Sequence, residues 1–292
     1  MKARILMIVL MAGIGLSLGA VERPTAKELL GQDTWRFSAG QLAILNEAPS
    51  GEIAPLIYGA IRAAGLELSP IKISESQWIC MNPNGPTQLI VRIEENPRGV
   101  ARGLYILAKI AGRYSVSTVD DAAPIHFYKA NGQAILVAYR EIMLLSEADP
   151  QVRYPLLYAW EDGALKEVSR KYPAFYKEEF VPKVHACIEE CTGKRGTEGG
   201  EGAEPSVIGS VPYEGWRTLE LAGMALAIAR VNSMFPAPIV SERDVKAVAS
   251  LLYDAMPTEG QAQVEERQEN IRKVCEQALK AMQGNRAPLE NP

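Results

Sequence analysis

Three short turns in the middle of the chain constrain its fold most strongly. Ala111-Gly112, Asn131-Gly132 and Asp162-Gly163 each separate two runs that are rich in β-branched and aromatic residues. Asn-Gly and Asp-Gly readily supply the positive φ angles that tight hairpin turns require, and between residues 71 and 168 the apolar period is 2. The sequence therefore predicts an antiparallel sheet. Its expected strands are residues 88–93, 104–109, 114–119, 125–129, 134–140, 155–160 and 165–168.

Helical periodicity flanks the sheet region on both sides. Residues 21–70 carry apolar side chains at helical spacing, and these faces need a surface to cover. A helix is expected over residues 173–191, with a kink at Pro182, and residues 207–285 predict three further helices. The expected fold class is therefore α+β, an antiparallel β-sheet covered by helices and followed by a C-terminal three-helix unit. The sequence leaves open whether that unit docks on the sheet.

The chain divides at the points where these patterns change. Residues 193–206 are rich in Gly and Glu and contain no large apolar side chain, which indicates a flexible linker. The expected organisation is a signal peptide at 1–20, an α+β domain at 21–192, this linker, and a C-terminal helical unit at 207–285. Within the α+β domain, residues 21–70 are expected to be helical and residues 71–168 to form the sheet.

An apolar stretch at the N-terminus predicts export. Lys2 and Arg4 precede an uncharged apolar run over residues 5–18, and small residues up to Ala20 offer a cleavage site. This run is shorter than the roughly 20 residues that span a bilayer, although an uncleaved anchor remains an alternative. We expect a periplasmic or secreted protein with no membrane span after signal cleavage.

The charge balance narrows the range of partners. The chain has 31 Lys and Arg against 35 Asp and Glu, and loss of Lys2 and Arg4 with the signal peptide leaves 29 basic side chains and a net charge of about −6. No three consecutive residues are Lys or Arg. Nucleic-acid and anionic-membrane binding depend on clustered positive charge. The sequence therefore predicts no nucleic-acid partner and leaves proteins and small molecules as candidates.

Four cysteines lie in the exported part of the chain. Cys80, Cys187, Cys191 and Cys275 are disulfide candidates, since an oxidising compartment favours pairing. Three connectivities are possible, and our preferred interpretation joins Cys187 or Cys191 to Cys275. Four buried free thiols are the structural alternative. A zinc site is the less favoured one, because His185 and Cys187 point nearly opposite ways in a helix.

The residue inventory excludes several catalytic mechanisms. The chain has only two histidines, His126 and His185, and no Gly-x-Ser-x-Gly elbow. P-loop, EF-hand and Gly-x-Gly-x-x-Gly motifs do not occur. The acid pair Asp120-Asp121 is typical of a polar strand end, because neighbouring residues on a strand face opposite sides. We therefore predict no catalytic residue, metal site or cofactor.

One segment resembles a known group of proteins. Trp160-Glu161-Asp162-Gly163, followed by Val168-Ser169, Tyr172-Pro173 and Tyr176, resembles a segment of secreted bacterial proteins with FG-GAP or VCBS-like β repeats. The similarity covers under twenty residues and implies a secreted β module. The alternating Asp and Gly loops that bind calcium in FG-GAP repeats do not occur here, and no functional residue follows from the resemblance.

Three functional hypotheses follow. The first is a non-catalytic exported protein whose helical surface or sheet edge binds another envelope protein or a second copy of itself. The second is a module that binds a small ligand or glycan between sheet and helices. The third, and least favoured, is a hydrolase or a thiol redox enzyme that uses Cys187 and Cys191.

Overall fold

The computed structural model describes residues 23–48, 50–63, 71–95, 103–120, 124–142, 144–145, 152–193, 213–257 and 266–284. The expected signal peptide and residues 194–206 of the expected linker lie outside these ranges. The predicted α+β fold class is confirmed.

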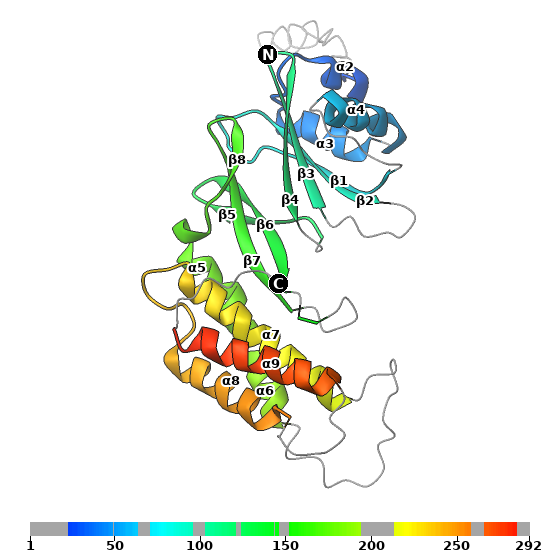
Figure 1. Ribbon diagram of the computed structural model, residues 1–292. Coiled ribbons are helices and arrows are strands. Elements are labelled where there is room, and N and C mark those ends of the chain that lie inside the picture. Colours follow the sequence, from blue (N-terminus) through cyan, green and yellow to red (C-terminus); the bar gives the residue numbers. More distant parts are fainter. Residues whose placement is uncertain are drawn as a thin grey trace, which may run out of the picture.

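Eight strands form two antiparallel sheets of four strands each (Figure 1). Their bounds are β1 (Ile71–Ile79), β2 (Gln88–Glu95), β3 (Gly103–Ile110) and β4 (Arg113–Asp120) in the first sheet, and β5 (His126–Ala130), β6 (Gln133–Ile142), β7 (Val152–Glu161) and β8 (Ala164–Glu167) in the second. In each sheet the strands pair in chain order. The prediction of seven strands missed β1, whose central residues Lys72 to Gln77 are mostly polar and whose register shifts between Ile73 and Glu75.

The three predicted hairpin turns are present. The two turn residues have φ of 48° and 77° at Ala111-Gly112, 51° and 74° at Asn131-Gly132, and 54° and 79° at Asp162-Gly163. Two successive positive φ angles are typical of type I′ turns, whose twist matches that of the flanking strands. These turns fix the register of the hairpins β3–β4, β5–β6 and β7–β8.

Helices precede and follow the sheets. Three come before β1, namely α2 (Ala26–Gly31), α3 (Ala39–Glu47) and α4 (Ser50–Ala63). After β8 come the 3-10 turn η1 (Ser169–Lys171), α5 (Pro173–Phe175), the π-helical turn η2 (Tyr176–Phe180), α6 (Val181–Gly193), α7 (Tyr213–Ser233), α8 (Glu242–Ala255) and α9 (Glu266–Met282). The irregularity expected at Pro182 therefore takes the form of a π-helical turn that ends just before it.

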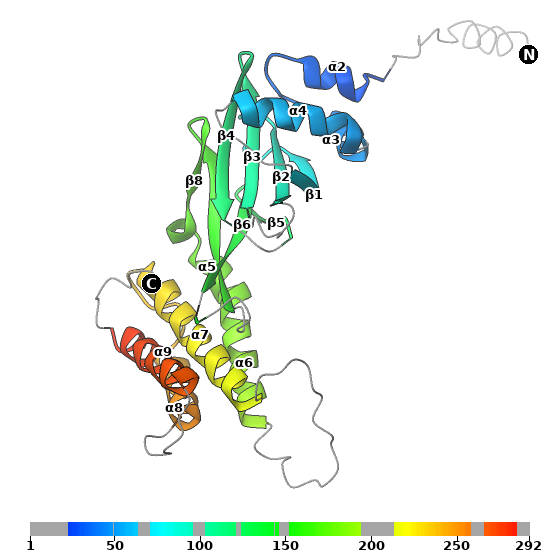
Figure 2. The same ribbon diagram turned by 45° about the vertical axis from the view of Figure 1, so that its right-hand side comes forward.

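The layers of the molecule follow from three apolar cores. Helices α2 to α4 cover one face of the first sheet, around Trp35, Trp78 and Leu89. The other face of that sheet packs against the second sheet, and helices α5 to α9 cover the far side and lower end of the second sheet (Figure 2). Each sheet therefore has one face against helices and one against the other sheet.

Small side chains bring the two sheets together. Ala108 of the first sheet and Ala138 of the second lie in the inter-sheet core with Trp160, all of them fully or almost fully buried. The backbone N–H of Ala134 donates a hydrogen bond to the carbonyl oxygen of Met81 at 3.0 Å, which joins the sheets directly. The two sheets thus share one core.

The C-terminal helices dock on the second sheet. Helix α7 packs against β6 and β7, and its Gly223 lies so close to β7 that an added Cβ would stand 2.5 Å from Cγ2 of Val152. Helices α8 and α9 then pack on α7. Within the part of the chain that the structure describes, no helix is long and apolar enough to cross a membrane.

Candidate functional site

The cysteines occupy three separate places, and the preferred disulfide does not form. All four thiols are free. Cys80 follows β1, Cys187 and Cys191 lie one turn apart on α6, and Cys275 is buried on α9. The physical reason is that α9 packs mainly on α7, whereas α6 packs on α8. The docking of the C-terminal helices thus results from apolar packing.

The environment of the thiols opposes thiolate chemistry. Burial raises the pKa of Cys187 to about 12, with nearby Cys191 and Glu220 adding to the effect. Burial also raises the pKa of Cys275 to about 12, and the pKa values of Cys80 and Cys191 are raised mainly by the same cause. Because the thiolate is the nucleophile in thiol redox chemistry, these groups are poor candidates for it.

The two histidines are both exposed and lie on different elements. His126 is exposed at the start of β5. His185, on α6, lies 3.2 Å from the carboxylate of Asp244 at the start of α8 and is also exposed. Among the residues described, no three His, Cys, Asp or Glu side chains come close enough together to hold a metal ion.

The segment that carries the family resemblance is used for packing. Trp160 lies in the inter-sheet core and Asp162-Gly163 forms the β7–β8 turn. Ser169 is buried, and its hydroxyl accepts a hydrogen bond from the backbone N–H of Leu157 at 3.0 Å. The hydroxyl of Tyr176 donates to the carbonyl oxygen of Pro155 at 2.9 Å. These contacts fasten the chain after β8 back onto β7.

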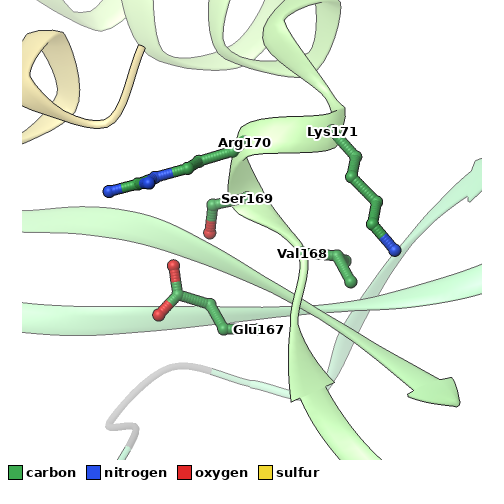
Figure 3. Close-up of a pocket in the computed structure, with 5 residues that line it drawn as sticks. All are labelled: Glu167, Val168, Ser169, Arg170 and Lys171. Carbon is green, nitrogen blue, oxygen red and sulfur yellow. The ribbon is translucent and has the colours of Figure 1, made fainter.

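A small pocket lies beside this segment. Residues 167–171 line a cavity of about 300 Å³ that is open to solvent. Glu167, Ser169 and Arg170 extend to one side of the segment, whereas Lys171 extends to the other (Figure 3). Lys171 pairs with Glu161 at 2.7 Å. The pocket thus places a carboxylate and a guanidinium near each other, in a shape too open to exclude water.

Charged side chains surround Tyr158 where β4 ends beside the second sheet. The pKa of Tyr158 on β7 is raised to about 12, mainly by burial and next by the charge of Glu167, with a smaller contribution from Asp120 and an opposing one from Arg140. Tyr158 is therefore a neutral phenol, which can donate a hydrogen bond but is not a base near neutral pH. Asp120, Glu167 and Arg140 therefore place charges of both signs around Tyr158.

Three of the four edge strands carry features that hinder further pairing. β1 has a register shift between Ile73 and Glu75, and Glu75 turns its carboxylate to Arg92 and the backbone N–H of Ile125. β5 has five residues and β8 has four. Bulges and short edges are common ways of preventing edge-to-edge association.

The fourth edge strand, β4, has none of these features. It pairs with β3 over eight residues without a register shift, and residues 114–119 (Tyr-Ser-Val-Ser-Thr-Val) contain neither charge nor proline. Within the described part of the chain no strand pairs with its other side. The views agree that this side faces towards β8 (Figures 1 and 2). We define the outer side of residues 113–120 as the β4 edge.

The hairpin turn identifies which backbone groups point outward from the β4 edge. Ile110 and Arg113 flank the two-residue turn and form its hydrogen-bonded pair, and bonding to β3 alternates from there. The N–H and C=O groups of Tyr114, Val116 and Thr118 therefore point away from β3, together with those of Asp120. They form a row of donors and acceptors that no strand in the described ranges pairs with.

The β4 edge has no distinctive sequence signal. The uncharged run at residues 114–119 was visible and was predicted as a strand, but only the strand order reveals that it lies at an edge. The tryptophans do not form an exposed platform for a glycan, because Trp35, Trp78 and Trp160 are buried in cores and only Trp216 is exposed.

Comparisons with known proteins assign no function to this chain. No protein-family model, curated protein or solved structure matches the chain. The resemblance of residues 160–176 to FG-GAP or VCBS-like segments therefore stays a proposal about origin. What the structure provides is an unprotected edge strand and a small open pocket.

Proposed function

We propose that this chain is a non-catalytic protein-interaction module of the cell envelope and that the β4 edge is its binding surface. The observation that carries the proposal is the contrast among the edges, since β4 alone is long, regular and uncharged in its interior. A strand of a partner can add to such an edge by backbone hydrogen bonds. The fold would then serve to hold the edge in place.

The chemistry of the side chains supports a binding role. The thiols of Cys187 and Cys275 are protonated at neutral pH, and the two histidines lie apart on exposed surfaces. The phenol of Tyr158 is neutral. His185 and Ser241 both contact the carboxylate of Asp244, but the serine hydroxyl donates to Asp244 and not to His185, so this group lacks the serine–histidine contact that acyl-transfer catalysis uses.

Rigid support makes the β4 edge a suitable binding surface. The inner face of β4 rests on the second sheet, and α4 covers part of the opposite face. A preorganised edge loses little conformational entropy when a strand adds to it, so more of the interaction energy appears as affinity. The proposal also includes export, because Lys2, Arg4 and the apolar run that follows them predict a protein located outside the cytoplasm.

Site-specific photo-crosslinking in cells tests this function. A photo-reactive phenylalanine analogue replaces the exposed Thr118 in the full-length chain, and Gln277 on the exposed face of α9 serves as the matched control position. We expect a discrete crosslinked product from position 118 and little from position 277. Absence of any product from position 118 under conditions where the protein accumulates would contradict the proposal.

Ligand binding is the second candidate, and the pocket at residues 167–171 favours it. The carboxylate of Glu167 and the guanidinium of Arg170 extend to the same side of the chain (Figure 3). Together they could accept and donate hydrogen bonds to a sugar or a zwitterion. Calorimetric titration with N-acetylglucosamine oligomers and with glycine tests this, and Arg170→Ala should remove any heat that comes from this site.

A further inference from the structure

We propose that Cys187 and Cys191 on α6 together form a covalent binding site for trivalent arsenicals, compounds in which one arsenic atom bonds both sulfur atoms. This site belongs to the C-terminal helices and uses side chains, whereas the β4 edge belongs to the first sheet and uses its backbone. The two proposals are therefore independent, and each can fail without the other.

The two cysteines are neighbours on one face of α6. They stand four residues apart in a continuous helix, a spacing at which Cβ atoms are about 5–6 Å apart. Both thiols are free, and both side chains are partly buried against the core that contains α7. A hydrogen bond between them raises the pKa of Cys187 and lowers that of Cys191, although burial is the main cause of the raised pKa of each. The sulfur atoms are therefore close enough for one atom to bond both.

The same spacing opposes a disulfide between these cysteines. The Cβ atoms of a disulfide are about 3.5–4.5 Å apart, less than the roughly 5–6 Å of this helical spacing. Closing the bond would require the backbone of α6 to move, although the helix continues to Gly193. An atom inserted between the two sulfurs spans the wider gap and leaves the helix unchanged.

The surroundings of the two thiols favour an uncharged product. After burial, Glu220 of α7 and Glu190 contribute to the raised pKa of both thiols, whereas Arg217 lowers the pKa of Cys191. Both groups are therefore neutral near pH 7, in a place that disfavours added negative charge. One Cu(I) ion held by two thiolates would leave a net negative charge there. Arsenic(III) bonded to two sulfurs and one further substituent is uncharged.

The number of donors also disfavours zinc. Zinc takes three or four protein ligands, and within the described ranges no third His, Cys, Asp or Glu side chain completes such a group. His185 contacts Asp244 of α8. A monosubstituted arsenical needs two thiols only, because its third bond is to its own carbon substituent.

The bonding step balances without a change of oxidation state. A monosubstituted arsenical in water carries two hydroxyl groups on arsenic. Two S–H bonds and two As–O bonds break, two As–S bonds and two O–H bonds form, and two water molecules leave. The step consumes the thiols in the protonated form that they have in this protein. Its rate should still rise with pH, since the thiolate is the attacking species.

Intact-mass spectrometry with phenylarsine oxide as the probe tests the inference. The full-length protein is first reduced with a phosphine, which is not a dithiol and does not compete for arsenic, and is then titrated with the probe. We expect one phenylarsenic group per wild-type chain. Cys187→Ser and Cys191→Ser should each weaken binding by about 10²–10⁴-fold, because the advantage of an intramolecular second bond is lost.

Two control proteins separate the geometry of the pair from the number of thiols. Cys275→Ser removes a buried thiol of α9 and should leave binding unchanged. Cys187→Ser combined with Glu189→Cys keeps four thiols, but positions 189 and 191 are two residues apart and do not face each other on the helix. This protein should bind as weakly as Cys191→Ser. Circular dichroism checks the fold of every variant, and alanine replaces serine wherever serine disturbs it.

Several results would overturn the inference. No uptake by the wild-type chain, or undiminished uptake by Cys187→Ser and Cys191→Ser, would show that this pair does not bind arsenic. Strong binding by the protein with the moved thiol would show that the spacing on α6 is not the cause. Full protection of the pair by equimolar zinc would identify a metal site instead. None of these results changes what crosslinking at Thr118 says about the β4 edge.

Discussion

The two sheets of this protein have the same topology but differ at their edges. Each is a four-stranded antiparallel meander with helices on one face and the other sheet on its second face. The second sheet ends in short edge strands, and the chain after β8 is fastened back by Ser169 and Tyr176. The first sheet ends in β4, which is long and regular. Strand order alone therefore does not say which sheet can bind a partner, whereas the edges do.

A substitution in the core that both sheets share should lower the stability of the protein more than a substitution elsewhere. Trp160→Ala removes the largest side chain of the inter-sheet core and should lower the free energy of unfolding by about 3–5 kcal/mol. Urea titration followed by circular dichroism measures this. Trp216→Ala, at an exposed position on α7, is the control and should cost far less. A single transition in the Trp160→Ala protein would show that the two sheets unfold together.

The four thiols should differ in their rates of alkylation. Because burial raises the pKa of Cys187 and Cys275 from 9.0 to about 12, their thiolate fraction at pH 8 is roughly 1,000-fold below that of an unperturbed thiol. Alkylation with iodoacetamide should therefore label Cys80 and Cys191 before Cys187 and Cys275. The rates at Cys187 and Cys275 should rise about tenfold for each unit of increasing pH. Mass spectrometry of the labelled peptides measures the order, and fast labelling of Cys187 at neutral pH would contradict the assigned environment.

Two glycines provide a matched test of helix packing in the two regions. Gly223→Ala on α7 places a methyl group 2.5 Å from Val152 and should lower the free energy of unfolding by about 1–3 kcal/mol. Gly59→Ala on α4 meets no atom within 4 Å and should raise it by about 0.4–1 kcal/mol, since alanine reduces the entropy of the unfolded chain. Thermal denaturation should show shifts of opposite sign. Shifts of the same sign would mean that α7 is not closely docked on β7.

The smallest expected effect concerns the fastening of the chain after β8. Ser169→Ala leaves the N–H of Leu157 without its acceptor in a buried place and should cost about 1–2 kcal/mol. Ser117→Ala on β4 is the counterpart in the first sheet, where the described residues offer its hydroxyl no hydrogen-bond partner, and should change stability by less than about 0.5 kcal/mol. Denaturant midpoints compare the two, and equal losses would remove the special role of Ser169.

Local patterns predicted much of the fold. The turns at Ala111-Gly112, Asn131-Gly132 and Asp162-Gly163 lie where expected, because a two-residue turn with positive φ depends on adjacent residues only. The division into two sheets was not predicted, since pairing between distant strands leaves no short-range signal. The break falls between β4 and β5, two strands that lie close together in the sequence but belong to different sheets.

The candidate site was harder to predict than the fold. The cysteines drew attention through their number, but the distance between Cys187 and Cys275 depends on how α6, α8 and α9 pack. The β4 edge has no unusual residue type. It differs from the other edge strands because it is long and has no register shift, and only the strand order shows that it lies at an edge. The proposed function therefore depends on backbone groups, which sequence motifs do not report.

Amide hydrogen exchange, read residue by residue by NMR, tests the central claim most directly. The amides of Ser115 and Ser117 bond to β3 and should be protected at every protein concentration, so they serve as internal controls. The amides of Tyr114, Val116 and Thr118 point outward, and the account predicts fast exchange in the isolated protein and protection once the protein captured by crosslinking at position 118 is added. Exchange at these three amides that stays fast in that complex would contradict binding through the β4 edge.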